Sequence, residues 1–154
     1  MKTKQATKQW TDNVTKALKN KGEKNGGYDV SLSNKTLPSK YLPNTRPDVV
    51  WQKGRRLRYL FELDQHGSNY QKTIYGSMLR GLILAQEFDL HFVQVIPNDE
   101  RHAMKIQQTL QAFKKLFHFK KADVLAIPRR AGHYSYDNIQ WEVLKGLRQL
   151  RIVK

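Results

Sequence analysis

Cysteine is absent from this chain of 154 residues, and acidic residues are few. The absence of cysteine excludes a disulfide framework and a zinc site with thiolate ligands. No apolar run approaches the roughly 20 residues that a membrane-spanning helix needs, and the lysine-rich N-terminus lacks the apolar core of a signal peptide. These absences predict a cytoplasmic protein with no membrane partner.

The shortage of acidic residues leaves a strongly basic chain. Lysine and arginine number 28 against 13 aspartate and glutamate, which gives a net charge of +15 at pH 7. Such a charge favours a polyanionic partner, and nucleic acid is the first candidate. An enzyme acting on nucleic acid, a binding protein without activity and a basic ribosome-associated protein would all show this balance, so charge alone does not choose between them.

The spacing of apolar residues predicts a single α/β domain over residues 1–154, with residues 1–6 as a flexible basic tail. Antiparallel strands followed by crossover helices predict a mixed β-sheet with helices on both faces. The expected helices are residues 7–20, 70–88, 99–117 and a C-terminal segment containing residues 139–150. Gly22, and then Gly26-Gly27, are expected to end the first of these helices. The expected strands are residues 28–32, 46–51, 59–64, 90–97 and 122–127.

Three carboxylates on two neighbouring strands form the candidate site. Asp48 precedes the apolar run Val49-Val50-Trp51, and Glu62 and Asp64 end the next apolar run. Residues two apart on a strand share a face, and antiparallel pairing can bring Asp48 beside them. Three carboxylates on one sheet face repel one another unless a cation lies between them, and a divalent metal is the usual solution.

A purely structural explanation of these acids also exists. Asp48 and Asp64 could be solvated residues at strand ends, and Glu62 could pair with an arginine of the hairpin. A charge that follows directly on an apolar strand is costly without a partner, however, which favours a functional explanation. Weaker candidates are His66, as a metal ligand or proton shuttle, and Asp12 or Glu23, as an acid supplied by a helix.

The acids also carry a resemblance to a known family. Pro47-Asp48, thirteen intervening residues and then Glu62-Leu63-Asp64 resemble the motif of the PD-(D/E)xK nuclease superfamily, and the likeness covers about residues 7–97. The resemblance implies a restriction-endonuclease-like core and a Mg²⁺ ion, which Mn²⁺ can replace. It implies that Asp48 and Glu62 bind the metal, and that the protein is an endonuclease that hydrolyses phosphodiester bonds, first of all in DNA.

The sequence departs from the family at one position, because Asp64 stands where the family usually has a lysine that helps to activate water. Asp64 is therefore a further candidate metal ligand, or a base acting with the metal. Lys72, at the start of the next helix, is the candidate replacement for the lysine, since its long side chain can reach back one turn. Gln71 and Tyr75 resemble the glutamine–tyrosine helix signature of RecB-like nucleases in this superfamily.

Two basic segments predict contacts with nucleic acid. The turn between the two acidic strands is rich in arginine, and we expect it to hold DNA beside the metal. The segment 129–137 mixes arginine with aromatic residues, which suits backbone contact and base stacking, although an ordinary basic loop has the same composition. From these segments the predicted contacts are Arg55, Arg56, Arg58, Arg129 and Arg130. The helix signature adds Gln71 and Tyr75 as further predicted contacts.

The chain is short for a nuclease with its own sequence-reading module. We therefore expect a homodimer, or a component directed to its substrate by a partner protein. Two alternatives stay open from the sequence. The first is a non-catalytic nucleic-acid-binding protein of the same fold, and the second is a basic ribosome-associated protein.

Overall fold

A computed structural model describes the backbone of residues 2–64, 70–98, 100–129 and 135–154. It is an α/β fold with a five-stranded sheet, whose strands lie in the order β1-β2-β3-β4-β5. The first three strands are antiparallel, and β4 and β5 continue the sheet in parallel to β3. The elements are α1 (Lys2–Gly26), β1 (Asp29–Leu32), β2 (Val49–Lys53), β3 (Arg56–Leu63), α2 (Tyr70–Phe88), β4 (His91–Pro97), α3 (Glu100–Phe117), β5 (Ala122–Ile127) and α4 (Tyr136–Gln149).

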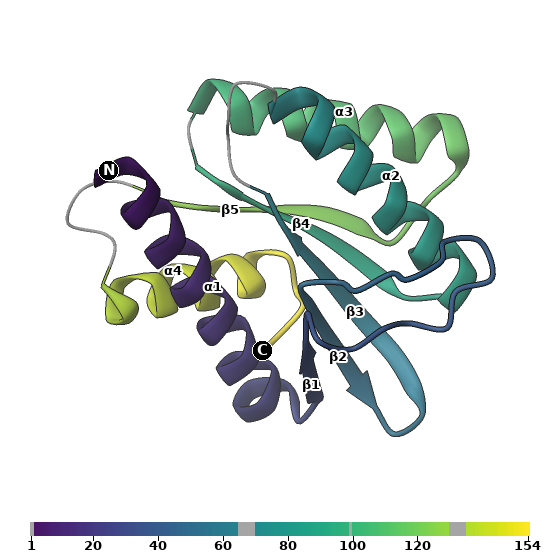
Figure 1. Ribbon diagram of the computed structural model, residues 1–154, viewed down its shortest axis with the longest axis horizontal. Helices are drawn as coiled ribbons and strands as arrows, with labels where there is room; N and C mark the ends of the chain where they lie inside the picture. Colours follow the sequence, from purple (N-terminus) through teal and green to yellow (C-terminus); the bar gives the residue numbers. More distant parts are fainter. Residues whose placement is uncertain (1, 65–69, 99, 130–134) are drawn as a thin grey trace.

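Helices cover both faces of the sheet, as the sequence predicts. Helices α2 and α3 lie on one face, and α1 and α4 lie on the other (Figure 1). Side chains of β4 alternate between the two layers: Phe92 and Ile96 pack with α2 and α3, whereas Val93 and Val95 pack with α1 and α4. A strand buried on both faces explains why residues 91–97 form a nearly continuous apolar run.

The first helix is longer than the sequence predicts. It begins at Lys2, so residues 2–6 are helical rather than a tail, and it continues past Gly22 to Gly26. Gly22 lies within the helix, where its Cα faces the Trp51 ring and an added Cβ would lie 2.6 Å from ring atoms. Gly27, with φ of 65°, is the residue that ends it. None of the described helices is both long and apolar enough to cross a membrane.

The β2–β3 hairpin fixes which ends of the strands meet. Val50 lies opposite Leu60, and Lys53 lies opposite Arg56 beside the turn at Gly54. Arg56 therefore starts β3 at the hairpin, and Leu63 ends it at the other edge of the sheet. The parallel strands β4 and β5 also end at the Leu63 edge.

Gly81 of α2 lies at a close approach between this helix and the sheet. A Cβ there would lie 2.2 Å from the buried Phe92 ring, whereas a Cβ at Gly76 would meet nothing within 4 Å. We expect Gly81→Ala to lower the free energy of unfolding by roughly 1–3 kcal/mol through overpacking. Gly76→Ala should raise it by up to about 1 kcal/mol through helix propensity. Urea unfolding of both variants checks this, and equal effects of the two substitutions would contradict the close approach.

Candidate active site

Asp48 and Glu62 lie beside each other at the edge of the sheet where β3 ends. Asp48 directly precedes β2 and extends the register in which Val50 lies opposite Leu60. Its Oδ2 accepts a hydrogen bond of 2.7 Å from the backbone N–H of Leu63. The carboxyl group of Asp48 is close enough to that of Glu62 to hydrogen-bond with it when one is protonated. The structure therefore brings together the two acids that the sequence pairs.

Glu62 is almost completely enclosed. Its exposed fraction is 6%, and it shares a sheet face with the buried residue Leu60, under α2. Burial, and then the negative charge of Asp48, raise the pKa of Glu62 from its ordinary value of 4.5 to about 9. Without a metal ion beside it, this carboxyl group holds its proton at neutral pH even though Arg80 is near.

Asp64 stands next to this pair and is held by neighbouring side chains. Its carboxylate accepts a hydrogen bond from Gln94 Nε2, and its backbone N–H donates to Val95 at 2.9 Å. Burial raises the pKa of Asp64, while the Ser77 hydroxyl and Gln94 oppose that rise. The buried Ser77 Oγ nevertheless makes no hydrogen bond of ordinary geometry within the described part of the chain.

Gln94 is a polar residue in the centre of an apolar strand. It is fully buried on β4 directly opposite Glu62, and its Nε2 also lies 3.5 Å from the Glu62 carbonyl oxygen. Its Oε1 has no hydrogen-bond partner among the described residues. A buried amide with one unsatisfied atom is costly unless the site gives it a role. In the sequence, this residue can be recognised as the single glutamine within the apolar run LHFVQVIP.

Among the residues that the structure describes, Arg80 of α2, rather than Lys72, is the cation that lies beside the acids. Its Nη2 lies 4.0 Å from Glu62 Oε2, and its charge opposes the raised pKa values of Glu62 and Asp64. Lys72 is an exposed residue near the start of the same helix. Ser77 and Arg80 are three residues apart and therefore lie on one side of α2. In the sequence, this spacing is the feature that places the two side chains together. The catalytic role of Lys72 stays a prediction.

The hairpin arginines do not lie beside the acids, contrary to the prediction from the sequence. Arg56 starts β3 at the turn, and Glu62 lies six residues further along the strand, which is roughly 20 Å at about 3.3 Å per residue. Arg55 and Arg56 are therefore at the opposite end of β3 from the acids, and Arg58 lies four residues, or roughly 13 Å, from Glu62. Their contact with nucleic acid stays a prediction. The error arose because a hairpin brings two strands together along their whole length, whereas the turn lies beside only one end of them.

Other candidates are not brought to the acids. Asp12 and Glu23 belong to α1 on the opposite face, where Glu23 pairs with Lys19 at 3.0 Å. Among the described residues, the arginine beside Glu62 is Arg80 of α2 and not an arginine of the hairpin. The Tyr75 hydroxyl accepts a hydrogen bond of 3.3 Å from Thr109 of α3.

Several predicted residues lie outside what the structure describes. These are His66, Arg130 and the side chain of Gln71. Arg129 is described and half-buried. Tyr136, expected in the same basic loop, instead begins α4, where the Lys16 ammonium lies 4.2 Å from the centre of its ring.

The residues at this edge fit a divalent cation bound by few protein ligands. Within the described ranges, no group of three or more histidine, aspartate or glutamate side chains is arranged to hold a metal ion. Mg²⁺ commonly takes only one or two carboxylates and completes its shell with water and substrate phosphate. Asp48 and Glu62 supply two such carboxylates, and burial without sufficient positive charge is what raises the Glu62 pKa. The role of Asp64 as a third ligand stays a prediction.

Comparison with known proteins adds no relative to this description. The chain matches no protein-family model, no curated protein and no solved structure.

Proposed function

We propose that this protein is a metal-dependent nuclease, acting first of all on DNA, with a restriction-endonuclease-like core. The observation that carries the proposal is the contact between Asp48 and a buried Glu62. The order of helix, three-stranded meander, helix and strand, which the resemblance to PD-(D/E)xK nucleases implies, supports it. The net charge of +15 supports a polyanionic substrate.

In this proposal each side chain has a separate task. Asp48 and Glu62 hold Mg²⁺ or Mn²⁺, which supplies an activated water and stabilises charge on the scissile phosphate when bound. The Leu63 N–H orients Asp48, and Gln94 holds Asp64 close to the pair. Asp64 binds the metal or accepts a proton from the attacking water. Arg80 stabilises the negative charge that develops on the phosphate.

Nicking of supercoiled plasmid by the purified protein, with Mg²⁺, Mn²⁺, Ca²⁺ or EDTA, tests the function. We expect nicked circles with Mg²⁺ or Mn²⁺ and none with EDTA. Binding of DNA that weakens with salt, without cleavage under any metal, would instead support a non-catalytic binding protein of this fold. Strong preference for structured RNA without cleavage would support a ribosome-associated protein. Dimerisation or a targeting partner would supply the substrate selectivity, and sedimentation with and without DNA tests the dimer.

Arg80→Gln is expected to reduce the cleavage rate by about 100-fold, as loss of one electrostatic stabiliser commonly does. Lys72→Gln removes the same charge from an exposed position of the same helix, and we expect a reduction of less than about ten-fold. Single-turnover cleavage of a short duplex at saturating protein measures both rates. A larger loss in the Lys72 variant would indicate that Lys72, near the start of α2, is the catalytic cation.

A further inference from the structure

A second polar site lies at the other end of the sheet, where β3, β4 and β5 begin. A pocket of about 410 Å³ opens there, a volume within the range of small-ligand sites. Four of its six lining residues carry basic side chains. The lining consists of Arg56, Arg58, Tyr59, Asp89, His91 and Lys121.

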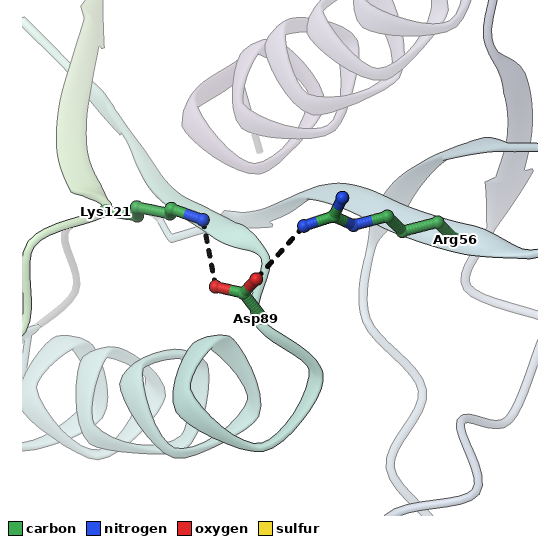
Figure 2. A network of polar contacts seen from close by, with 3 residues as sticks. All are labelled: Arg56, Asp89 and Lys121. Carbon is green, nitrogen blue, oxygen red and sulfur yellow. Dashed lines mark hydrogen bonds and ion pairs between the residues drawn. The ribbon is translucent and has the colours of Figure 1, made fainter.

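Two cations of this pocket converge on one carboxylate. Arg56 Nη2 lies 3.0 Å from Asp89 Oδ2, and Lys121 Nζ lies 2.9 Å from Asp89 Oδ1 (Figure 2). Arg56 starts β3, Asp89 directly follows α2 and Lys121 directly precedes β5, so the fold itself brings the cations together. Both cations lower the pKa of Asp89, Lys121 more than Arg56. The Asp89 carboxylate therefore lies at the point where the two cations converge.

The Asp89 carboxylate is suited to being displaced from the two cations by another anion. Its side chain is 69% exposed, and those of Arg56 and Lys121 are more than half exposed. Ion pairs between exposed side chains contribute little stability, so another anion can replace the carboxylate at small cost. Asp89 has φ of 50° directly after α2, a conformation that aspartate and asparagine both tolerate.

The remaining side of the pocket is aromatic and rigidly held. His91 Nε2 lies 2.6 Å from Asp123 Oδ2, which fixes the orientation of the imidazole ring. The Tyr59 ring lies 5.4 Å from the His91 ring, between their centres. Aromatic and basic groups together are the combination that binds nucleotides, because the rings contact a base and the cations contact its phosphate.

We propose that this pocket binds the phosphate group of a nucleotide, with Arg56 and Lys121 exchanging the Asp89 carboxylate for the phosphate oxygens. Arg58 and His91 lie beside the bound phosphate, and Tyr59 contacts the base. The nucleotide is either free or the phosphorylated end of a nucleic acid strand. The site goes beyond the proposed hydrolysis and stands or fails separately, because it lies roughly 20 Å along β3 from Glu62.

Isothermal titration of the full chain with inorganic phosphate and with adenosine monophosphate tests the pocket. We expect saturable binding of both, tighter for the nucleotide. Arg56→Gln and Lys121→Gln should each weaken binding about ten-fold. Asp89→Asn should tighten it about five-fold, since it removes the competing charge and keeps the backbone conformation.

Arg55→Gln is the matched control, because Arg55 carries the same charge at the adjacent position but does not line the pocket. Weakening by Arg55→Gln equal to that by Arg56→Gln would overturn the proposal, as would unchanged affinity in Asp89→Asn. A single-stranded oligonucleotide with and without a 5′-phosphate distinguishes the two sources. At least ten-fold tighter binding of the phosphorylated strand identifies a strand end. Equal binding of the two strands, together with binding of the monophosphate, identifies a free nucleotide.

Discussion

Asp48→Asn is expected to lower the single-turnover rate of metal-dependent DNA cleavage by about 1,000-fold or more, a loss of roughly 4 kcal/mol of transition-state stabilisation. Asparagine keeps an oxygen that can accept the hydrogen bond from the Leu63 N–H, so the strand end keeps its conformation. It removes the negative charge that, with Glu62, attracts the metal. Affinity for DNA, measured by fluorescence anisotropy in Ca²⁺, should stay within about three-fold of wild type, because phosphate contacts supply it.

Asp12→Asn provides the control for this variant. Asp12 is an exposed carboxylate of α1, and α1 covers the face of the sheet opposite to the acids. The substitution removes the same charge by the same chemistry, and we expect wild-type cleavage. Normal cleavage by Asp48→Asn, or equal losses in the two variants, would contradict a role for Asp48 at the reacting phosphate.

Glu62→Gln is expected to stabilise the metal-free protein at alkaline pH while abolishing cleavage. In the unfolded chain Glu62 loses its proton near pH 4.5, whereas in the folded chain its pKa is about 9. Between these values the folded state binds more protons, so stability is full at low pH and falls as pH rises. By pH 8 the loss amounts to roughly 3–5 kcal/mol at about 1.4 kcal/mol per pKa unit. Glutamine has no proton to lose and escapes this penalty.

Urea unfolding in EDTA at pH 5 and pH 8 measures the effect. Wild type should lose stability between these values, and Glu62→Gln should lose less, with a smaller remainder from the raised pKa of Asp64. Glu23→Gln is the matched control, because Glu23 is exposed in a surface pair with Lys19. A wild-type pH profile in Glu62→Gln would show that Glu62 is ionised in the folded protein without a metal.

The sequence pattern predicts most of the architecture because the helices have a helical apolar spacing and the central strands are apolar runs of strand length. The apolar spacing of α2 and the continuous apolar runs of β4 and β5 agree with the structure to within one residue at each end. The C-terminal end of α1 is predicted too early, because Gly22 lies within the helix against the Trp51 ring and the helix continues to Gly26. A glycine needed for close packing and a glycine that ends a helix look the same in a sequence.

The candidate site was predictable only in part, because some of its contacts depend on how distant elements pack together. Asp48 and Glu62 are linked by strand pairing, which follows from local pattern and turn length. Gln94 and Arg80 reach the site through the packing of α2 on the sheet and the parallel pairing of β4. Those contacts depend on how far along β3 the crossover helix lies, and no local spacing specifies that distance. The position of the hairpin arginines differs from the prediction for another reason, because the turn lies beside only one end of the paired strands.

The most direct test of the metal site is a titration of the full chain with Mn²⁺ at pH 8. Binding is measured as the loss of the free-ion signal in electron paramagnetic resonance. We expect one Mn²⁺ per chain that Mg²⁺ displaces, and we expect Asp48→Asn and Glu62→Gln each to weaken binding by about ten-fold or more. Asp12→Asn should bind as wild type does. Equal Mn²⁺ affinity in all four proteins would contradict a metal site at Asp48 and Glu62.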